Sequence, residues 1–235
     1  DLLSIHGLME SVIQYNDLSD AGWLTHDLGM TYGHNTDFAG TVIHHNWVHD
    51  NRAKGLGMGI YFDHLSHNVV VHSNLLWNVT GDAIRINNPS YFDLVINNTC
   101  YNTNTASKQI GSFDHSRRQD LYAVRWLNNL FNVPLALPEN AVVANNLALS
   151  DPGYADPGNL GFTLKPGSPA AGAGVLLPGV TQGAAPDAGA FPRGAAPWRA
   201  GHDFAHPPAP EPVLPAPDIA WMNAVWGPDS VQARA

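Results

Sequence analysis

The sequence predicts an all-β protein, a right-handed parallel β-helix (solenoid), followed by a Pro-rich extended C-terminal segment. Two observations support this prediction. A short motif, an apolar residue followed four positions later by asparagine, recurs six times along the chain. Glycine (22 residues) and proline (18 residues) are also frequent among the 235 residues, whereas charged residues make up only 13%. This composition favours short strands joined by turns over long surface helices.

The repeated motif sets the size of one coil. Successive asparagines lie 18 to 30 residues apart, and the longer spacings leave room for three short strands per coil. If coils stack at the β-sheet spacing, an asparagine at a corner can bond the amide of the next coil and form a ladder. The six asparagines are Asn16, Asn46, Asn74, Asn98, Asn128 and Asn146. A second polar column follows four residues after each of them, at Asp20, Asp50, Asn78, Asn102, Asn132 and Ser150.

The residues between the two polar columns are assigned to faces by strand alternation. The middle residue is small or apolar in every copy, and we expect it to point into the core. These core positions are Leu18, Val48, Leu76, Cys100, Leu130 and Ala148. Trp47, His49, Trp77 and Tyr101 should then lie on the outer surface.

A second strand can be aligned in the same way. Its copies are residues 28–32, 59–63, 83–87 and, less regularly, 110–113. This alignment stacks Ile60 and Phe62 on Ile84 and Ile86 inside the cylinder. It leaves four residues outside, namely Tyr61, Asp63, Arg85 and Asn87. The alternative is an antiparallel β-sandwich whose asparagines occupy ordinary turns.

The chain divides into two parts by composition. Residues 1–193 form the predicted β-helix, and residues 194–235 are rich in Pro and Ala, which cannot continue a hydrogen-bonded stack. We expect residues 194–217 to lie along the solenoid as an extended strap, followed by a short helix or a tail. Because the sequence opens almost directly on a repeat unit, we also expect N-terminal coils to be supplied by a second chain or removed by cleavage.

Charge and hydropathy exclude several partners. The formal net charge is −9, and the 11 Lys and Arg residues form no basic stripe, so nucleic acid is not an expected partner. No apolar run is long enough to span a membrane. The single cysteine, Cys100, cannot form an internal disulfide and reads as a small core residue.

These motifs resemble the pectate-lyase-like right-handed parallel β-helix superfamily of carbohydrate-active proteins, over residues 8 to 195. The most specific parts are the asparagine corners, the run at residues 59–63 followed by residues 68–74, and the ending at residues 162–170 and 186–191. The ending is similar to the last coil of secreted carbohydrate-active β-helices. The resemblance therefore implies a secreted protein that acts on a poly- or oligosaccharide lying across the β-helix face.

The candidate site is the outward cluster around Asp63. Glycoside hydrolysis needs a carboxylic acid and a second carboxylate on either side of the scissile bond. The candidate catalytic residues are Asp63, Asp37, Arg85 and His64. The candidate substrate-binding residues are Tyr61, Asn87, His34, Trp47 and Trp77. The run at residues 59–63 is similar to a strand of several β-helix glycosidase families in which an Asp is often catalytic. The next coil has Asn87 at the position where a second catalytic carboxylate would be expected.

Two alternatives to hydrolysis remain open. A polysaccharide lyase would use Arg85, Lys54, Tyr61 or His64, with Ca²⁺ bridging an acidic substrate; hydrolysis needs no cofactor. A non-catalytic β-helix for glycan binding or assembly would use Asp63 and Arg85 only as a structural ion pair, and the C-terminal strap would cover the tryptophans.

No metal site is expected, because the histidine spacing matches no known zinc motif. The histidines expected to be solvent-exposed on β faces are His44, His45, His49, His64, His67 and His72.

Overall fold

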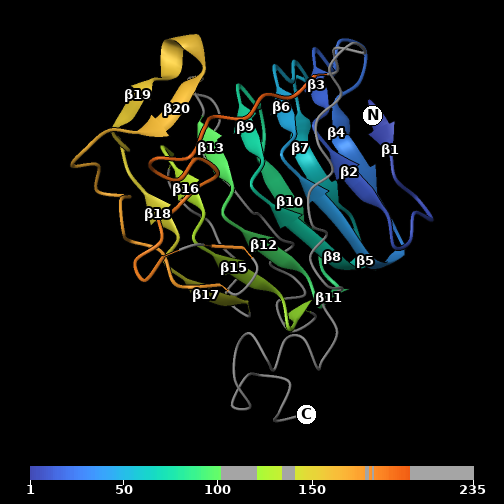
Figure 1. The fold of residues 1–235 in the computed structure, drawn as a ribbon. Helices are drawn as coiled ribbons and strands as arrows, with labels where there is room; N and C mark the ends of the chain where they lie inside the picture. The colour runs from blue at the N-terminus through green and yellow to red at the C-terminus, as the bar shows by residue number, and fades with distance from the viewer. Residues whose placement is uncertain (102–120, 134–140, 178–179, 182, 202–235) are drawn as a thin grey trace.

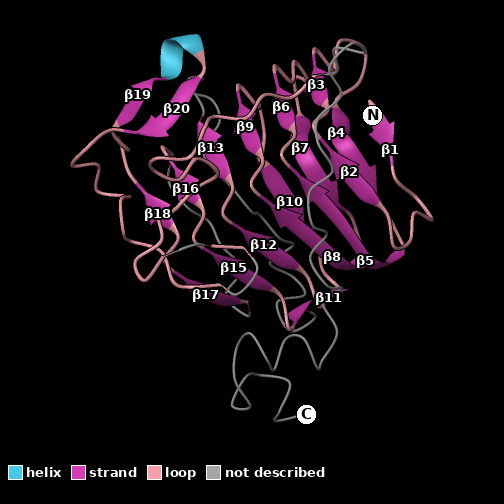
Figure 2. Cartoon of the chain, viewed as in Figure 1, coloured by secondary structure: helices cyan, strands magenta, loops and turns pink. Residues whose placement is uncertain are grey.

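The chain folds as a parallel β-solenoid in which nearly every regular element is a strand (Figure 1, Figure 2). The computed structural model describes residues 1–101, 121–133, 141–177, 180–181 and 183–201. Within these ranges, no helix has the length and apolar character needed to cross a bilayer. The expected strand at 110–113, the polar position Asn102 and the chain after residue 201 lie outside the described residues.

Three parallel sheets form the walls of the solenoid, and their strands run from blue to yellow-green along the stack in Figure 1. Sheet 1 contains β1 (Leu3–Ser4), β4 (Asp27–Gly33), β7 (Leu56–Phe62) and β10 (Ile84–Ile86). Sheet 2 contains β2 (Val12–Gln14), β5 (Asp37–His44), β8 (His67–His72), β12 (Leu94–Ile96), β15 (Arg125–Leu127) and β17 (Val142–Ala144). Sheet 3 contains β3 (Asp17–Ser19), β6 (Trp47–His49), β9 (Leu75–Trp77), β13 (Thr99–Tyr101), β16 (Leu130–Phe131) and β18 (Leu147–Ala148). The antiparallel sandwich is therefore excluded.

Two further small sheets lie within the described part of the chain. Strands β11 (Ser90–Tyr91) and β14 (Leu121–Tyr122) pair in parallel. Strands β19 (Tyr154–Asp156) and β20 (Gly161–Leu164) pair antiparallel around the short 3₁₀ helix η2 (Pro157–Asn159).

A buried asparagine ladder lies at the corner between sheets 2 and 3, as the repeat predicts. The side-chain oxygen of Asn74 accepts hydrogen bonds from the backbone and the side chain of Asn46, both at 3.0 Å. The same geometry links Asn74 to Asn98. The residue before each ladder position has a positive φ, for example 51° at His45 and 52° at Ser73, which gives the chain its sharp turn.

The prediction was wrong by one residue in the fifth coil. Asn129, not Asn128, occupies the ladder and accepts from the Asn98 backbone at 2.9 Å. Phe131 is accordingly the neighbour of Cys100 in the core column, and Leu130 points to the outer face. The sequence has two adjacent asparagines here, and the pairing of β13 with β16 decides which one enters the ladder.

The cylinder is filled by apolar side chains from all three sheets. Ile60 and Phe62 are register neighbours of Ile84 and Ile86, as predicted, and all four are fully buried. The core column of sheet 2 contains Ile13, Ile43, Val71, Val95 and Trp126. Close packing of these columns fixes which side chains remain on the outer wall.

The C-terminal part does not end as a further coil, contrary to expectation. Residues 154–164 form the antiparallel β19–β20 hairpin, and residues 186–201 run back along the outside of the solenoid (Figure 1). In this segment, which we call the strap, Gly189 donates to the Asn128 carbonyl and Gly201 donates to the Tyr15 carbonyl. The strap thus begins before residue 194 and crosses the coils from the fifth to the first.

Candidate functional site

The outer face of sheet 1 brings together the polar residues that the alignment predicts there. Arg85 of β10 is the register neighbour of Tyr61 in β7, and Tyr61 is the neighbour of Tyr32 in β4. Asp63 and Asn87 follow one position beyond the ends of β7 and β10. Residues distant in sequence therefore form one row of adjacent side chains, at the spacing of sheet strands.

The Asp63 carboxylate is the centre of this row. Its Oδ1 accepts hydrogen bonds from Asn87 Nδ2 at 2.8 Å and from the His64 backbone at 2.9 Å. The same oxygen lies 2.7 Å from His64 Nδ1. Its Oδ2 accepts from the Tyr32 hydroxyl at 3.0 Å. Hydrogen bonds from several directions hold the carboxylate in one orientation and favour its ionised form.

Arg85 fixes the orientation of the Asn87 amide. The guanidinium can only donate, so Asn87 Oδ1 faces Arg85 Nε at 2.9 Å. The amide nitrogen is then directed to Asp63 and to the Tyr61 hydroxyl, at 2.8 Å in each case. Arg85 also forms an ion pair with Asp82 at 3.4 Å. The expected direct pairing of Arg85 with Asp63 is thus replaced by a relay through Asn87.

The electrostatics of the row follow from burial and from these bonds. Burial raises the pKa of Asp63, but the hydrogen bonds from Asn87, the His64 backbone and Tyr32 outweigh it and leave the net pKa below the usual value. Burial, together with the Asp63 charge, raises the pKa of Tyr32 to about 12. The pKa of Tyr61 is also raised, first by burial and then by Asp63. The site therefore holds an ionised carboxylate beside two neutral phenols at neutral pH.

His64 is the most accessible member of the group. Its side chain is 43% exposed, against 17% for Asp63. The short contact to Asp63 uses Nδ1, so Nε2 is the ring nitrogen directed away from the carboxylate. A carboxylate that holds one imidazole nitrogen while the other faces outward can support acid–base chemistry.

Asp37 is held by a different set of hydrogen-bond partners from Asp63. Its Oδ1 accepts from Asn68 Nδ2 at 2.8 Å and from the Ala39 backbone at 2.9 Å, and His67 Nε2 lies 3.7 Å from Oδ2. Burial raises its pKa, but the Asn68 and Ala39 hydrogen bonds give a net lowering. Asp37 thus belongs to the start of β5, while Asp63 belongs to the end of β7.

His34 and Lys54 are exposed residues that do not take part in the hydrogen bonds of Asp63. His34 is exposed at the end of β4, with its ring 6.5 Å from His6. Lys54 is exposed in the loop before β7. Neither side chain is among the hydrogen-bond partners of Asp63 in the described part of the chain.

Trp47 and Trp77 lie on the outer face of sheet 3, which the C-terminal residues cover. Trp47 is only 9% exposed and packs in an apolar cluster with Phe162 and Phe191. Trp77 is partly buried against the same cluster and stacks on His49, with 3.9 Å between ring centroids. The structure thus places both rings under the C-terminal cover, on a different wall from Asp63.

Two residues that interact with this row were not identified from the sequence as site residues. Tyr32 bonds the carboxylate directly, and its register position beside Tyr61 is the signal that could have found it. Asp27, at the start of β4, lies near enough for its charge to raise the pKa of both tyrosines. Asp27 adds a second carboxylate near the tyrosine pair.

The histidines at the end of sheet 2 differ from expectation. His44 is 1% exposed and His72 is 8% exposed, so neither is a solvent-facing residue. The strap and neighbouring side chains enclose this corner, and no local sequence pattern predicts that burial.

Comparison of the chain with family models, with curated proteins and with solved structures finds no match in any of the three.

Proposed function

We propose that this protein is a secreted carbohydrate-active enzyme that hydrolyses a glycosidic bond at the outer face of sheet 1. The observation that supports this most directly is the Asp63–His64 pair. An ionised, mostly buried carboxylate holds the imidazole of a more exposed histidine at 2.7 Å. Neighbouring positions supply aromatic and hydrogen-bonding side chains that suit sugar rings.

In the proposed reaction, His64 Nε2 removes a proton from water, and the resulting hydroxide adds to the anomeric carbon. The bond between that carbon and the leaving oxygen breaks, and the oxygen takes up a proton from a carboxylic acid. Asp63 stabilises the imidazolium that forms, because its charge lies at hydrogen-bond distance.

Asn87 supports this assignment rather than weakening it. A carboxylate in place of the amide would lie within hydrogen-bond distance of Asp63, and two such charges would raise the pKa of one of them. The amide keeps Asp63 ionised and available to the histidine. A neutral glycan suits the site, because the chain has a net charge of −9.

The test is a panel of neutral and acidic glycans incubated with the purified protein, with new reducing ends as the measured product. Asp63→Asn and His64→Ala are each expected to lower turnover at least ~100-fold, the usual contribution of an acid–base group. Asp20→Asn is the matched control, because Asp20 is an exposed carboxylate that pairs with Arg52 on another corner. Full turnover in Asp63→Asn would refute the assignment.

A second candidate, polysaccharide lyase, is favoured by the position of Arg85. Its guanidinium lies on the same face and could neutralise a uronate carboxylate while His64 removes the adjacent proton. Lyase action forms an unsaturated product that absorbs ultraviolet light, whereas hydrolysis forms none. Glycan binding without either product would instead favour a non-catalytic β-helix.

A further inference from the structure

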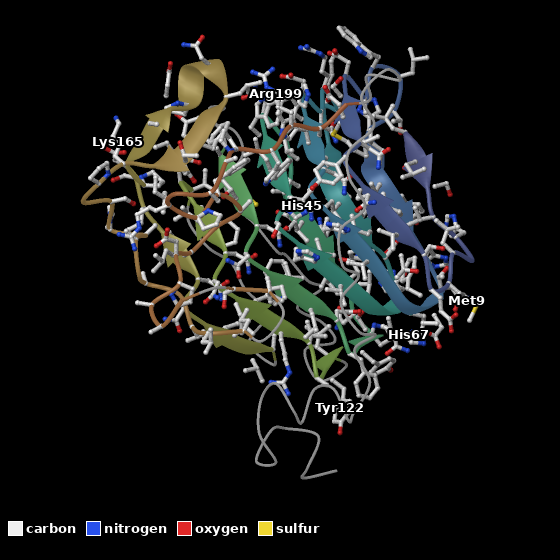
Figure 3. All side chains as sticks on the ribbon, viewed as in Figure 1. Met9, His45, His67, Tyr122, Lys165 and Arg199 are labelled. Atoms are coloured by element: carbon white, nitrogen blue, oxygen red, sulfur yellow. The ribbon has the colours of Figure 1, made fainter. Side chains whose placement is uncertain are left out.

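Three histidines meet at the corner between sheets 2 and 3, well away in the fold from the Asp63 row. His44 and His72 are the last residues of β5 and β8 and are cross-strand neighbours. Their rings stack with 4.7 Å between centroids and 9° between planes. His45 follows His44 with a φ of 51°, and this turn brings its ring to 5.0 Å from that of His44. Figure 3 labels His45 on this wall.

The ring nitrogens are close enough to share one ion. One ligand atom from each of the three residues lies within 4.8 Å of the others. The Nδ1 atoms of His44 and His45 are 2.7 Å apart. Nitrogens in a tetrahedral zinc site with bonds of 2.0–2.1 Å are separated by about 3.3 Å. The His44 and His45 nitrogens would therefore have to move apart slightly, and the stacked His44 and His72 rings would have to tilt so that both direct a nitrogen at one ion.

The surroundings favour the neutral imidazole, which is the form that coordinates metals. His44 and His72 are nearly fully buried. His72 Nδ1 also lies 3.1 Å from the Ser73 hydroxyl, a partner that fixes the ring and leaves Nε2 for a ligand.

A cavity of about 910 Å³ adjoins the cluster. His45, His72 and Asn97 line it on the solenoid side, and the strap lines the other side with Asp187, Phe191 and Trp198. The His45 and Trp198 rings are 4.9 Å apart. A ligand in this cavity could reach the histidines directly, so the cluster has access to a fourth donor.

We propose that His44, His45 and His72 form a binding site for a divalent transition-metal ion, with Zn²⁺ as the natural occupant and the fourth coordination position facing the cavity. Three imidazoles suit zinc, copper, nickel and cobalt, whereas magnesium and calcium require oxygen ligands. Three protein ligands with one open position are the arrangement of catalytic zinc sites. This site is independent of the hydrolase assignment, because it uses neither Asp63 nor His64.

The test uses the full chain after treatment with a chelator and dialysis. Titration with ZnCl₂ in competition with a chromophoric chelator is expected to show one tight equivalent, and Ca²⁺ is expected not to compete. Co²⁺ should give the intense visible bands of a four-coordinate ion. His45→Ala, at a half-buried position, and His72→Gln should each weaken Zn²⁺ binding at least tenfold. His26→Ala is the matched control, since His26 is exposed and outside the cluster.

Circular dichroism and metal-free unfolding curves will show that the variants fold. A wild-type protein that binds no tight equivalent of Zn²⁺ would overturn the proposal. So would a folded His45→Ala variant, or a folded His72→Gln variant, that binds Zn²⁺ with wild-type affinity. Loss of Zn²⁺ binding in His26→Ala equal to that in His45→Ala would overturn it as well.

Discussion

Asn87 donates its side-chain amide to Asp63 at 2.8 Å, across two adjacent coils of sheet 1. The same nitrogen donates to the Tyr61 hydroxyl, and the amide oxygen accepts from Arg85. One amide therefore connects a cation, a phenol and a carboxylate. The neutral Asn87 amide favours the ionised form of Asp63, because a carboxylate at position 87 would repel the Asp63 charge.

Asn87→Asp is expected to raise the pKa of Asp63 by at least about one unit, because two carboxylates would then lie within hydrogen-bond distance. NMR titration of the side-chain carboxyl carbons measures this shift. Asn68→Asp is the matched control, since Asn68 donates in the same way to Asp37. It should raise the pKa of Asp37 and leave Asp63 unchanged. An unaltered Asp63 titration in Asn87→Asp would contradict the relay.

Asn74→Ala should lower the free energy of unfolding by about 2–4 kcal/mol, because it leaves several buried backbone and amide groups without a partner. Asn74 is fully buried and also donates to the Ile43 carbonyl at 2.9 Å. Chemical denaturation measures the change. Asn16→Ala, at the exposed end of the ladder, should cost less than half as much. Equal losses at both positions would argue against the ladder as the source of stability.

Asp93→Asn should stabilise the protein increasingly as pH rises. Asp93 is fully buried, and burial raises its pKa to about 8 despite hydrogen bonds from Ser90 and the Val69 backbone. Since the unfolded value is about 3.9, the folded state retains a proton between about pH 4 and pH 8 that the unfolded chain loses. Wild-type stability therefore falls with rising pH in this window, by up to about 1.4 kcal/mol per pH unit.

The asparagine variant lacks this dependence. Denaturation curves at several pH values should therefore show the difference in unfolding free energy between Asp93→Asn and wild type growing toward pH 8. Parallel curves for the two proteins would mean that Asp93 is ionised in the folded state.

Gly189→Ala should loosen the strap from the solenoid. Gly189 has a φ of +93°, and a Cβ there would lie 2.7 Å from Thr99 Oγ1 and 3.1 Å from Leu130 Cβ. Gly194→Ala is the matched control, because Gly194 has a φ of +77° with open space at the Cβ position. Both variants carry the strain of a left-handed alanine, about 1–2 kcal/mol, but only the first adds a clash. Limited proteolysis should cut the strap faster in Gly189→Ala, and equal rates would contradict the predicted clash.

The sequence by itself determined the solenoid and the Asp63 row. The asparagine motif fixed the coil length, and strand alternation fixed which residues of β7 and β10 face outward, because both depend on short-range periodicity. The same reasoning predicts that Tyr61, Asp63, Arg85 and Asn87 lie together on one face, as the register of β7 and β10 shows. Hydrogen-bond directions within that row were not predictable, since they depend on side-chain torsions.

The tertiary structure alone decided the rest. The choice between Asn128 and Asn129 depended on the register of β13 and β16, because tandem asparagines fit a corner equally well in sequence. The strap that faces His45 and His72 across the cavity comes from more than 100 residues later in the chain. No local pattern encodes such a contact, since the free energy of covering a wall comes from the apolar surface buried between distant segments.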